Sequence, residues 1–152
     1  MRIEQCVWSA ATGWQSCKTP GDPAPPGVPR PGAVTGLVWV FGDPELLTDE
    51  RIAELRTRFP HAHLVGCSTA GEVHGTTVSD HGLVATATLF DQTTVVTRYA
   101  TVSASTESLA AGRQLAAALP SEGLRHVVVL SDGLIVNGSA LATGLVGALP
   151  FT

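Results

Sequence analysis

The stretch Gly36-Leu37-Val38-Trp39-Val40-Phe41 is a continuous apolar run that starts at one glycine and is followed by another. Such a run is typical of a β-strand that is covered on both faces. The same pattern returns at His126-Val127-Val128-Val129-Leu130, which gives the strongest strand prediction in the chain. The two runs indicate an α/β or mixed α+β fold, in which helices flank a layered β-sheet.

A helix is expected directly after the first of these strands. Asp43-Pro44-Glu45 combines a side-chain acceptor at the N-cap, a proline at the first helical position and an acid near the positive end of the helix dipole. Ile52, Leu55 and Phe59 follow at spacings of three and four, which places them on one side of a helix. We therefore predict a helix that buries these three side chains and ends at Pro60.

The remaining elements are predicted from similar patterns. β-Branched runs at 83–90 and 93–100 predict an inserted antiparallel hairpin. Six prolines within 20–31 exclude a helix there, so residues 10–33 are expected to be a loop. The other predicted elements are strands at 3–9 and 61–67, a helix from 105 to 119 and a final helix that is capped near Asn137 and runs to about 149. The chain accordingly divides into 1–32, an N-terminal strand with a proline-rich loop, and 33–152, the layered domain.

The composition is that of a globular chain. Of its 152 residues, 44% are hydrophobic and 14% are charged, and the formal net charge is −4. Lys18 is the only lysine and no basic cluster occurs, which argues against nucleic acid as a partner. The N-terminus lacks the apolar core of a secretory signal, and no run approaches the ~20 apolar residues that span a bilayer, so we expect a cytoplasmic protein. Cys6, Cys17 and Cys67 are too few for a disulfide framework and are expected to be reduced.

Small polar residues close three of the predicted strands. In open α/β sheets, ligands bind outside the carboxyl ends of the strands, so these segments are the default ligand site. Glycines there let the backbone approach a ligand, and Asp43, Glu72 and Asp132 could bind an ammonium group. Ordinary turns select the same residue types, which is the alternative interpretation. The three segments are Gly42-Asp43, Gly66–Glu72 and Ser131-Asp132-Gly133.

The sequence contains no complete catalytic constellation. Cys67 could act as a nucleophile, but no histidine is placed beside it to generate a thiolate. Neither a phosphate-binding loop nor a GxGxxG motif occurs, so we expect no enzymatic activity and no resident cofactor. His61 and His63 would share one face of a strand with Cys67, but the spacing matches no recognised zinc pattern. A haem axial histidine is an open alternative, because it needs only one imidazole and an apolar pocket.

Three segments of the chain resemble the N-terminal part of FIST domains. They are Leu37–Gly42, Leu64–Glu72, and Val129–Leu134 continued to Asn137-Gly138, and the string Gly66-Cys67-Ser68-Thr69-Ala70-Gly71-Glu72 is the most specific. The resemblance covers about residues 33–150. It implies an intracellular sensory module of signal transduction that binds small ligands such as amino acids and works with kinase, cyclase, chemotaxis or F-box output partners. One branch of that family is described as haem-binding and responsive to nitric oxide.

The resemblance also implies a ligand role for two segments that strand-end geometry selects independently, Cys67–Glu72 and Ser131–Gly133. Our leading hypothesis is therefore a non-enzymatic sensor of a small ligand. The alternatives are a Cys67-dependent enzyme, a ligand-free interaction scaffold and a haem-binding gas sensor. The candidate ligand-binding residues are Gly42, Asp43, Cys67, Ser68, Thr69, Ala70, Gly71, Glu72, Ser131, Asp132, Gly133 and Asn137.

The chain departs from the FIST pattern in two places. The proline-rich segment stands where the family has a helix after its first strand, and the sequence stops before the family's further strands and C-terminal half. The chain therefore resembles a truncated or minimal version of the family. An unfinished sheet edge would favour a homo-oligomer or a partner strand.

Overall fold

The computed structural model describes residues 1–17 and 36–149 and divides into two compact units, Met1–Val95 and Val96–Thr152, each with its own core. The proline-rich part of the predicted loop, 18–33, lies outside the described residues. Within the described ranges, no helix is both long and apolar enough to cross a membrane. The mixed α+β fold class predicted from the sequence is confirmed.

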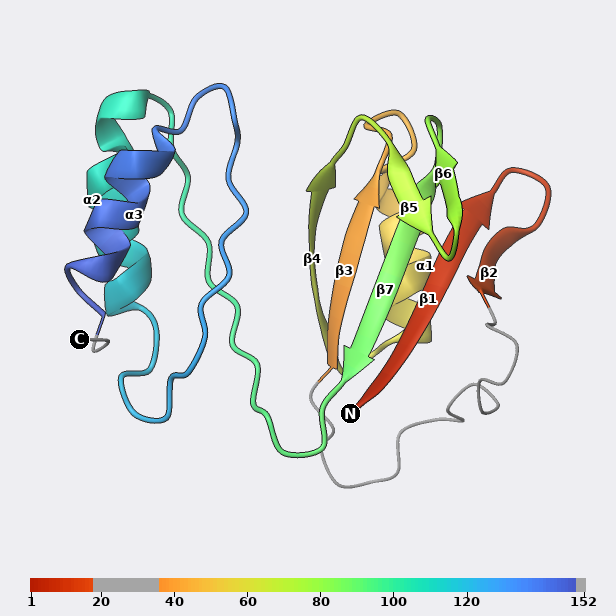
Figure 1. The fold of residues 1–152 in the computed structure, drawn as a ribbon, viewed down its shortest axis with the longest axis horizontal. Helices are drawn as coiled ribbons and strands as arrows, with labels where there is room; N and C mark the ends of the chain where they lie inside the picture. The colour runs from red at the N-terminus through yellow and green to blue at the C-terminus, as the bar shows by residue number, and fades with distance from the viewer. Residues whose placement is uncertain (18–35, 150–152) are drawn as a thin grey trace. The chain divides into compact units, whose positions relative to one another are not determined.

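The first unit is built on a mixed five-stranded sheet (Figure 1). Its strands follow the spatial order β2-β1-β7-β3-β4, in which β3 and β4 are parallel and every other pair is antiparallel. The strands predicted near 3–9, 36–41, 61–67 and 83–90 are therefore confirmed. The bounds are β1 (Arg2–Ser9), β2 (Gly13–Cys17), β3 (Gly36–Gly42), β4 (Ala62–Ser68) and β7 (Leu83–Leu89).

Strand β2 lies in a stretch that was predicted to be a loop, and for residues 13–17 that prediction is wrong. The prolines that support a loop begin only at Pro20, after the strand has ended. The chain turns back after Ser9, and Trp14 then pairs directly with Trp8 on β1. Cross-strand aromatic pairs of this kind stabilise a hairpin.

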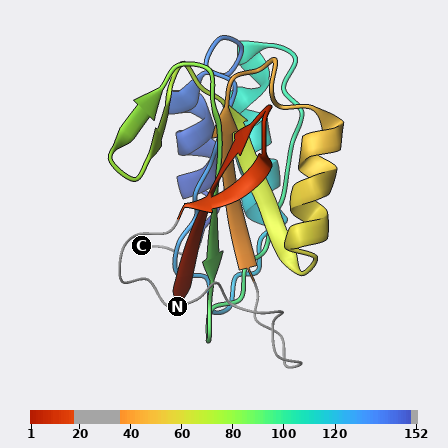
Figure 2. The ribbon, with the colours of Figure 1, turned by 90° about the vertical axis from the view of Figure 1, so that its right-hand side faces the viewer.

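Helix α1 (Asp49–Arg58) covers one face of this sheet (Figure 2). Leu55 is fully buried, and Ile52 and Phe59 pack beside it, so the predicted apolar stripe is confirmed. Burial raises the pKa of the Cys6 thiol to about 11, so this cysteine behaves as a small apolar core residue. The buried core of the unit consists of Cys6, Val38, Val40, Leu55, Leu83, Ala85 and Ala87.

The helix starts later than the sequence predicted. Its N-cap is Thr48, whose hydroxyl accepts the Arg51 N–H, and not Asp43. Asp43-Pro44-Glu45 instead forms a turn in which the Asp43 side chain accepts the Glu45 N–H at 2.8 Å. The same residue types cap helices and turns, because both need a side-chain acceptor for a free backbone N–H.

The predicted hairpin of 83–90 with 93–100 is wrong. Strand β7 is paired along both edges, with β1 on one side and β3 on the other, so no edge is free for residues 93–100. Those residues have no strand assignment. A shorter hairpin precedes β7 and makes a separate two-stranded sheet, β5 (Glu72–His74) with β6 (Thr77–Ser79).

The second unit contains a short 3-10 helix, η1 (Ser105–Glu107), followed by α2 (Ser108–Ala117) and α3 (Gly138–Val146). The two α-helices pack against each other through Ala111, Ala116, Leu141 and Leu145. Both helices and the Asn137 cap were predicted and are confirmed, since the Asn137 side chain accepts the Ala140 N–H at 3.0 Å. Leu109 and Leu119 lie at the margin of this helix pair and are half-buried, and Ala148 is exposed.

The strand predicted at His126–Leu130 is not formed. These residues have no strand assignment, and no backbone hydrogen bond to them occurs among the described residues. Val128 is 67% exposed, where a central strand would bury it. An apolar run predicts burial, but a strand also needs a neighbour that completes its hydrogen bonds, and periodicity does not report on neighbours.

Candidate functional site

Three segments of the first unit meet where β3 and β4 end and β7 begins. The Asp43 N–H donates to the Gly82 carbonyl at 2.9 Å, and the Thr69 N–H donates to the Gly42 carbonyl at the same distance. The parallel register of β3 and β4 brings Gly42 opposite Ser68. Two of the three segments predicted to form a ligand site, Gly42-Asp43 and Cys67–Glu72, therefore lie together, as the carboxyl ends of parallel strands should.

Asp43 lies at this junction, and each of its two carboxylate oxygens has a hydrogen-bond partner there. Oδ1 accepts the Glu45 N–H at 2.8 Å, and Oδ2 lies 2.7 Å from Nδ1 of His81. The hydrogen bond from His81, together with the Glu45 N–H, lowers the pKa of the Asp43 carboxyl. The same hydrogen bond raises the pKa of His81, with smaller contributions from the charges of Asp80 and Glu45. Asp43 is therefore a carboxylate at neutral pH.

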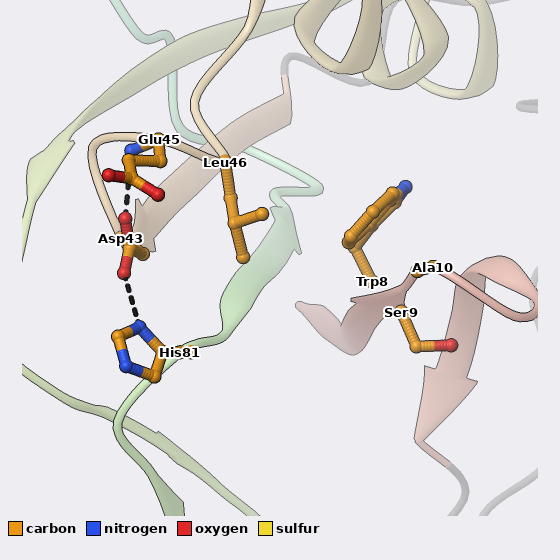
Figure 3. Close-up of a pocket in the computed structure, with 7 residues that line it drawn as sticks. All are labelled: Trp8, Ser9, Ala10, Asp43, Glu45, Leu46 and His81. Atoms are coloured by element: carbon orange, nitrogen blue, oxygen red, sulfur yellow. Dashed lines mark hydrogen bonds and ion pairs between the residues drawn. The ribbon is translucent and has the colours of Figure 1, made fainter.

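A pocket of about 380 Å³ opens beside Asp43. Figure 3 shows Asp43, Glu45 and His81 on one side of it, Trp8 with Ser9 and Ala10 on the other, and Leu46 between them. One wall thus has two acidic residues and an imidazole, and the opposite wall has the Trp8 ring with the small residues Ser9 and Ala10. The volume lies within the range of small-molecule sites, which start at roughly 300 Å³.

The aromatic wall is held in place by Arg51 of α1. The Arg51 guanidinium lies 3.7 Å from the centre of the Trp8 ring and donates to the Leu46 carbonyl at 2.7 Å. The indole N–H of Trp14 donates to the Arg51 carbonyl at 3.3 Å. Such cation–π stacking orients an aromatic ring, so the position of the Trp8 wall depends on the start of α1.

Glu72 was predicted to bind ligand, but its contacts in the structure are internal. Its side chain is buried, and the carboxylate accepts the Thr69 hydroxyl at 2.8 Å and the Gly82 N–H at 2.9 Å. The Gly82 carbonyl also accepts the Asp43 N–H, so the Glu72 side chain and the Asp43 backbone both bind Gly82. The structure therefore gives Thr69 and Glu72 a supporting position behind the pocket, while Cys67, Ser68, Ala70 and Gly71 are exposed.

Replacing Glu72 with alanine should lower the free energy of unfolding by roughly 1–3 kcal/mol, because the buried Gly82 N–H would lose its acceptor. Urea unfolding followed by circular dichroism measures the change. Glu54→Ala, which removes an exposed glutamate from α1, serves as the control and should stay within about 0.5 kcal/mol of the wild type. Equal effects of the two substitutions would contradict the supporting role of Glu72.

The other predicted site residues lie in the second unit. Asp132 accepts the Leu134 and Ile135 N–H groups at 2.7 and 2.8 Å, and the Ile135 and Leu134 hydrogen bonds lower the pKa of its carboxyl. Asn137 caps α3, and its own N–H donates to the Ser108 hydroxyl at 2.9 Å. Ser131 and Gly133 are exposed. The ligand role of Ser131, Asp132, Gly133 and Asn137 stays a prediction.

Sequence reasoning missed six of the seven residues that line the pocket, all except Asp43: Trp8, Ser9, Ala10, Glu45, Leu46 and His81. His81 precedes β7, and only the antiparallel pairing of Gly42 with Leu83 brings it to Asp43. Trp8 arrives from β1 on the other side of β7. The available sequence signal was that Asp43 directly follows one strand-like run, 36–42, and that His81 comes shortly before another, 83–89. Among the described residues, no three His, Cys, Asp or Glu side chains gather as metal ligands would.

The first unit is thus a mixed-sheet domain in which glycine, hydroxyl and carboxylate residues stand at the ends of the two parallel strands. The family model described as the FIST N domain matches residues 36–152. The chain therefore belongs to the FIST family, and the FIST domain is a sensory domain of signal transduction. Neither a curated protein nor a solved structure matches the chain significantly.

Proposed function

We propose that this protein is a cytoplasmic sensory module that binds a small ligand with an ammonium group, such as an amino acid, without chemical turnover. The observation that carries the proposal is the pocket at the end of β3, which places the carboxylates of Asp43 and Glu45 opposite the Trp8 ring. Carboxylates attract an ammonium group, and an aromatic wall accommodates the apolar part of the same small molecule.

The acidic wall favours Asp43 as the principal partner of the ammonium group. Its Oδ1 accepts the Glu45 N–H of the following turn, so the position of the carboxylate is fixed before a ligand arrives. Glu72, the other first-unit carboxylate considered from the sequence, is only 2% exposed and is not one of the residues that line the pocket. Preorganised groups of this kind reduce the entropy cost of binding.

Ligand binding would act on signalling by stabilising the loops around the pocket. Asp43–Leu46 and His81 lie in such loops, between regular elements of the sheet and helix. A ligand that contacts them shifts the population towards one arrangement, which a signalling output domain or protein then recognises. The proposal includes no catalytic step at Cys67, which is an exposed free thiol at the end of β4.

A thermal-shift screen of the 152-residue chain against the amino acids, small carboxylates and hemin tests this function. We expect an amino acid to raise the midpoint of the wild type by several degrees and to have no effect on Asp43→Asn, which loses the charge but keeps an acceptor for the Glu45 N–H. A ligand present at about 100 times its Kd stabilises by about 2.7 kcal/mol, which is ample for detection. Asp132→Asn is the matched control.

Each other outcome contradicts a stated part of the proposal. A shift that survives in Asp43→Asn and disappears in Asp132→Asn would place the site at the Ser131–Gly133 turn. A shift by hemin alone would favour the haem sensor. Loss of the shift in Cys67→Ala would implicate the thiol, and a cooperative melt without any shift would leave the scaffold interpretation.

A further inference from the structure

His81 covers the carboxylate that the proposed ligand needs. Its Nδ1 lies 2.7 Å from Oδ2 of Asp43, and the two side chains differ sharply in exposure, at 87% for His81 and 13% for Asp43. The imidazole therefore lies at the edge of the pocket, between solvent and a largely covered carboxylate (Figure 3). The other oxygen of Asp43 is engaged by the Glu45 N–H.

The charges that act on His81 are all acidic. Asp43 and Glu45 act from the turn after β3, and Asp80 precedes His81 in the chain. The Glu72 carboxylate lies on β5 and accepts the N–H of the next residue, Gly82. A protonated His81 is thus the counter-charge of this cluster, in the position where a ligand's ammonium group would otherwise neutralise Asp43.

We propose that His81 is an internal competitor for the ligand: its imidazolium binds Asp43 while the pocket is empty and is displaced, with release of its proton to the solvent, when an ammonium group binds. This inference rests on the proposed function, because it requires an amine at Asp43. It adds a regulation that the ligand site alone does not imply, since binding becomes coupled to pH.

The direction of this coupling follows from linkage. In the empty protein, Asp43 raises the pKa of His81 above its ordinary value. A bound ammonium neutralises that carboxylate, so the pKa of His81 falls in the complex. Between these two pKa values binding releases a proton, and affinity rises with pH by up to about tenfold per pH unit. Above the pKa of the empty protein, affinity no longer depends on His81.

The test uses 3-methylbutylammonium, which carries an ammonium group and a small apolar tail and stays charged from pH 5.5 to 7.5. Its Kd is measured by NMR on the full chain at both pH values, with 3-methylbutanol as the uncharged control. We expect tighter binding at pH 7.5 by several-fold in the wild type. His81→Ala should bind as tightly at pH 5.5 as at pH 7.5, and His61→Ala, which removes another exposed histidine, should behave like the wild type.

A second readout needs no ligand. The pH titration of the His81 Cε1–H signal should move to lower pH in Asp43→Asn, and an unchanged midpoint would overturn the pairing on which the inference depends. Equal Kd values at the two pH values in the wild type would overturn the competition and leave the ligand site standing. No binding by either the wild type or His81→Ala at both pH values would overturn the ammonium site itself, and the competition with it.

Discussion

Replacing Gly66 with alanine should detach β4 from the sheet and lower the free energy of unfolding of the first unit by about 3 kcal/mol or more. Gly66 pairs with Val40 on β3, and a Cβ at Gly66 would lie 1.8 Å from the Val40 carbonyl oxygen. The obstacle is backbone, which cannot rotate away as a side chain can. Overpacking in a well-packed site costs roughly 1–3 kcal/mol and occasionally more. We expect the upper end here, because a rearrangement of side chains cannot relieve a contact between the new Cβ and the Val40 backbone.

Hydrogen exchange of the full chain, combined with urea unfolding, measures this effect strand by strand. Amides of β4 should lose protection first in Gly66→Ala, because β4 is an edge strand whose one neighbour among the described strands of this sheet is β3. Gly71→Ala is the matched control, since a Cβ there meets only ordinary contacts at 3.6 and 3.7 Å. Unchanged β4 protection in Gly66→Ala would show that the β3–β4 register differs from the one described.

The second large effect is expected at Gly112, where α2 lies against the backbone of α3. A Cβ at Gly112 would lie 2.3 Å from the Leu141 carbonyl oxygen and 2.9 Å from the Leu145 N. Alanine in place of a glycine in an exposed helix interior stabilises by about 1 kcal/mol through helix propensity. Here we expect the opposite sign, a loss of roughly 1–3 kcal/mol, because α2 and α3 must move apart.

Hydrogen exchange of the α2 and α3 amides in the full chain measures the stability of the second unit independently of the first. Gly112→Ala should reduce protection in both helices and leave the sheet of the first unit unchanged. Gly138→Ala, at the start of α3, is the control because nothing lies within 4 Å of its added Cβ. Increased helix protection in Gly112→Ala would mean that propensity dominates and that the helices do not pack this closely.

Much of the fold could be predicted because local patterns and tertiary structure agree. β3 and β7 are apolar runs that become inner strands, and Ile52, Leu55 and Phe59 occupy one helix face that packs on them. The failures are also physical. Residues 93–100 and 126–130 have the composition of strands, but strand formation depends on a hydrogen-bonding neighbour that is distant in sequence. For 93–100, the edges of β7 are already taken by β1 and β3.

The residues of the candidate site could likewise be predicted only in part from the sequence. Strand-end reasoning brought Gly42 and Asp43 together with Thr69 and Glu72, because parallel strands must end at one edge. The same reasoning could not find Trp8 or His81. Trp8 reaches the pocket because β1 pairs with β7, and His81 reaches it because β7 pairs with β3. Strand-end reasoning also could not separate a ligand-facing carboxylate from a supporting one, because Asp43 and Glu72 differ only in burial and in the partners they already have.

The sheet order has a consequence for synthesis of the protein on the ribosome. β7 is the last strand of the five-stranded sheet to be made, yet it stands between β1 and β3, and Gln5 contacts Thr86 across 81 residues of chain. At about 5–20 residues per second, the first strand therefore waits roughly 4–16 s for its inner neighbour. During that interval the nascent β1 exposes an unpaired inner edge, which makes this stage the one at which a chaperone would recognise the chain.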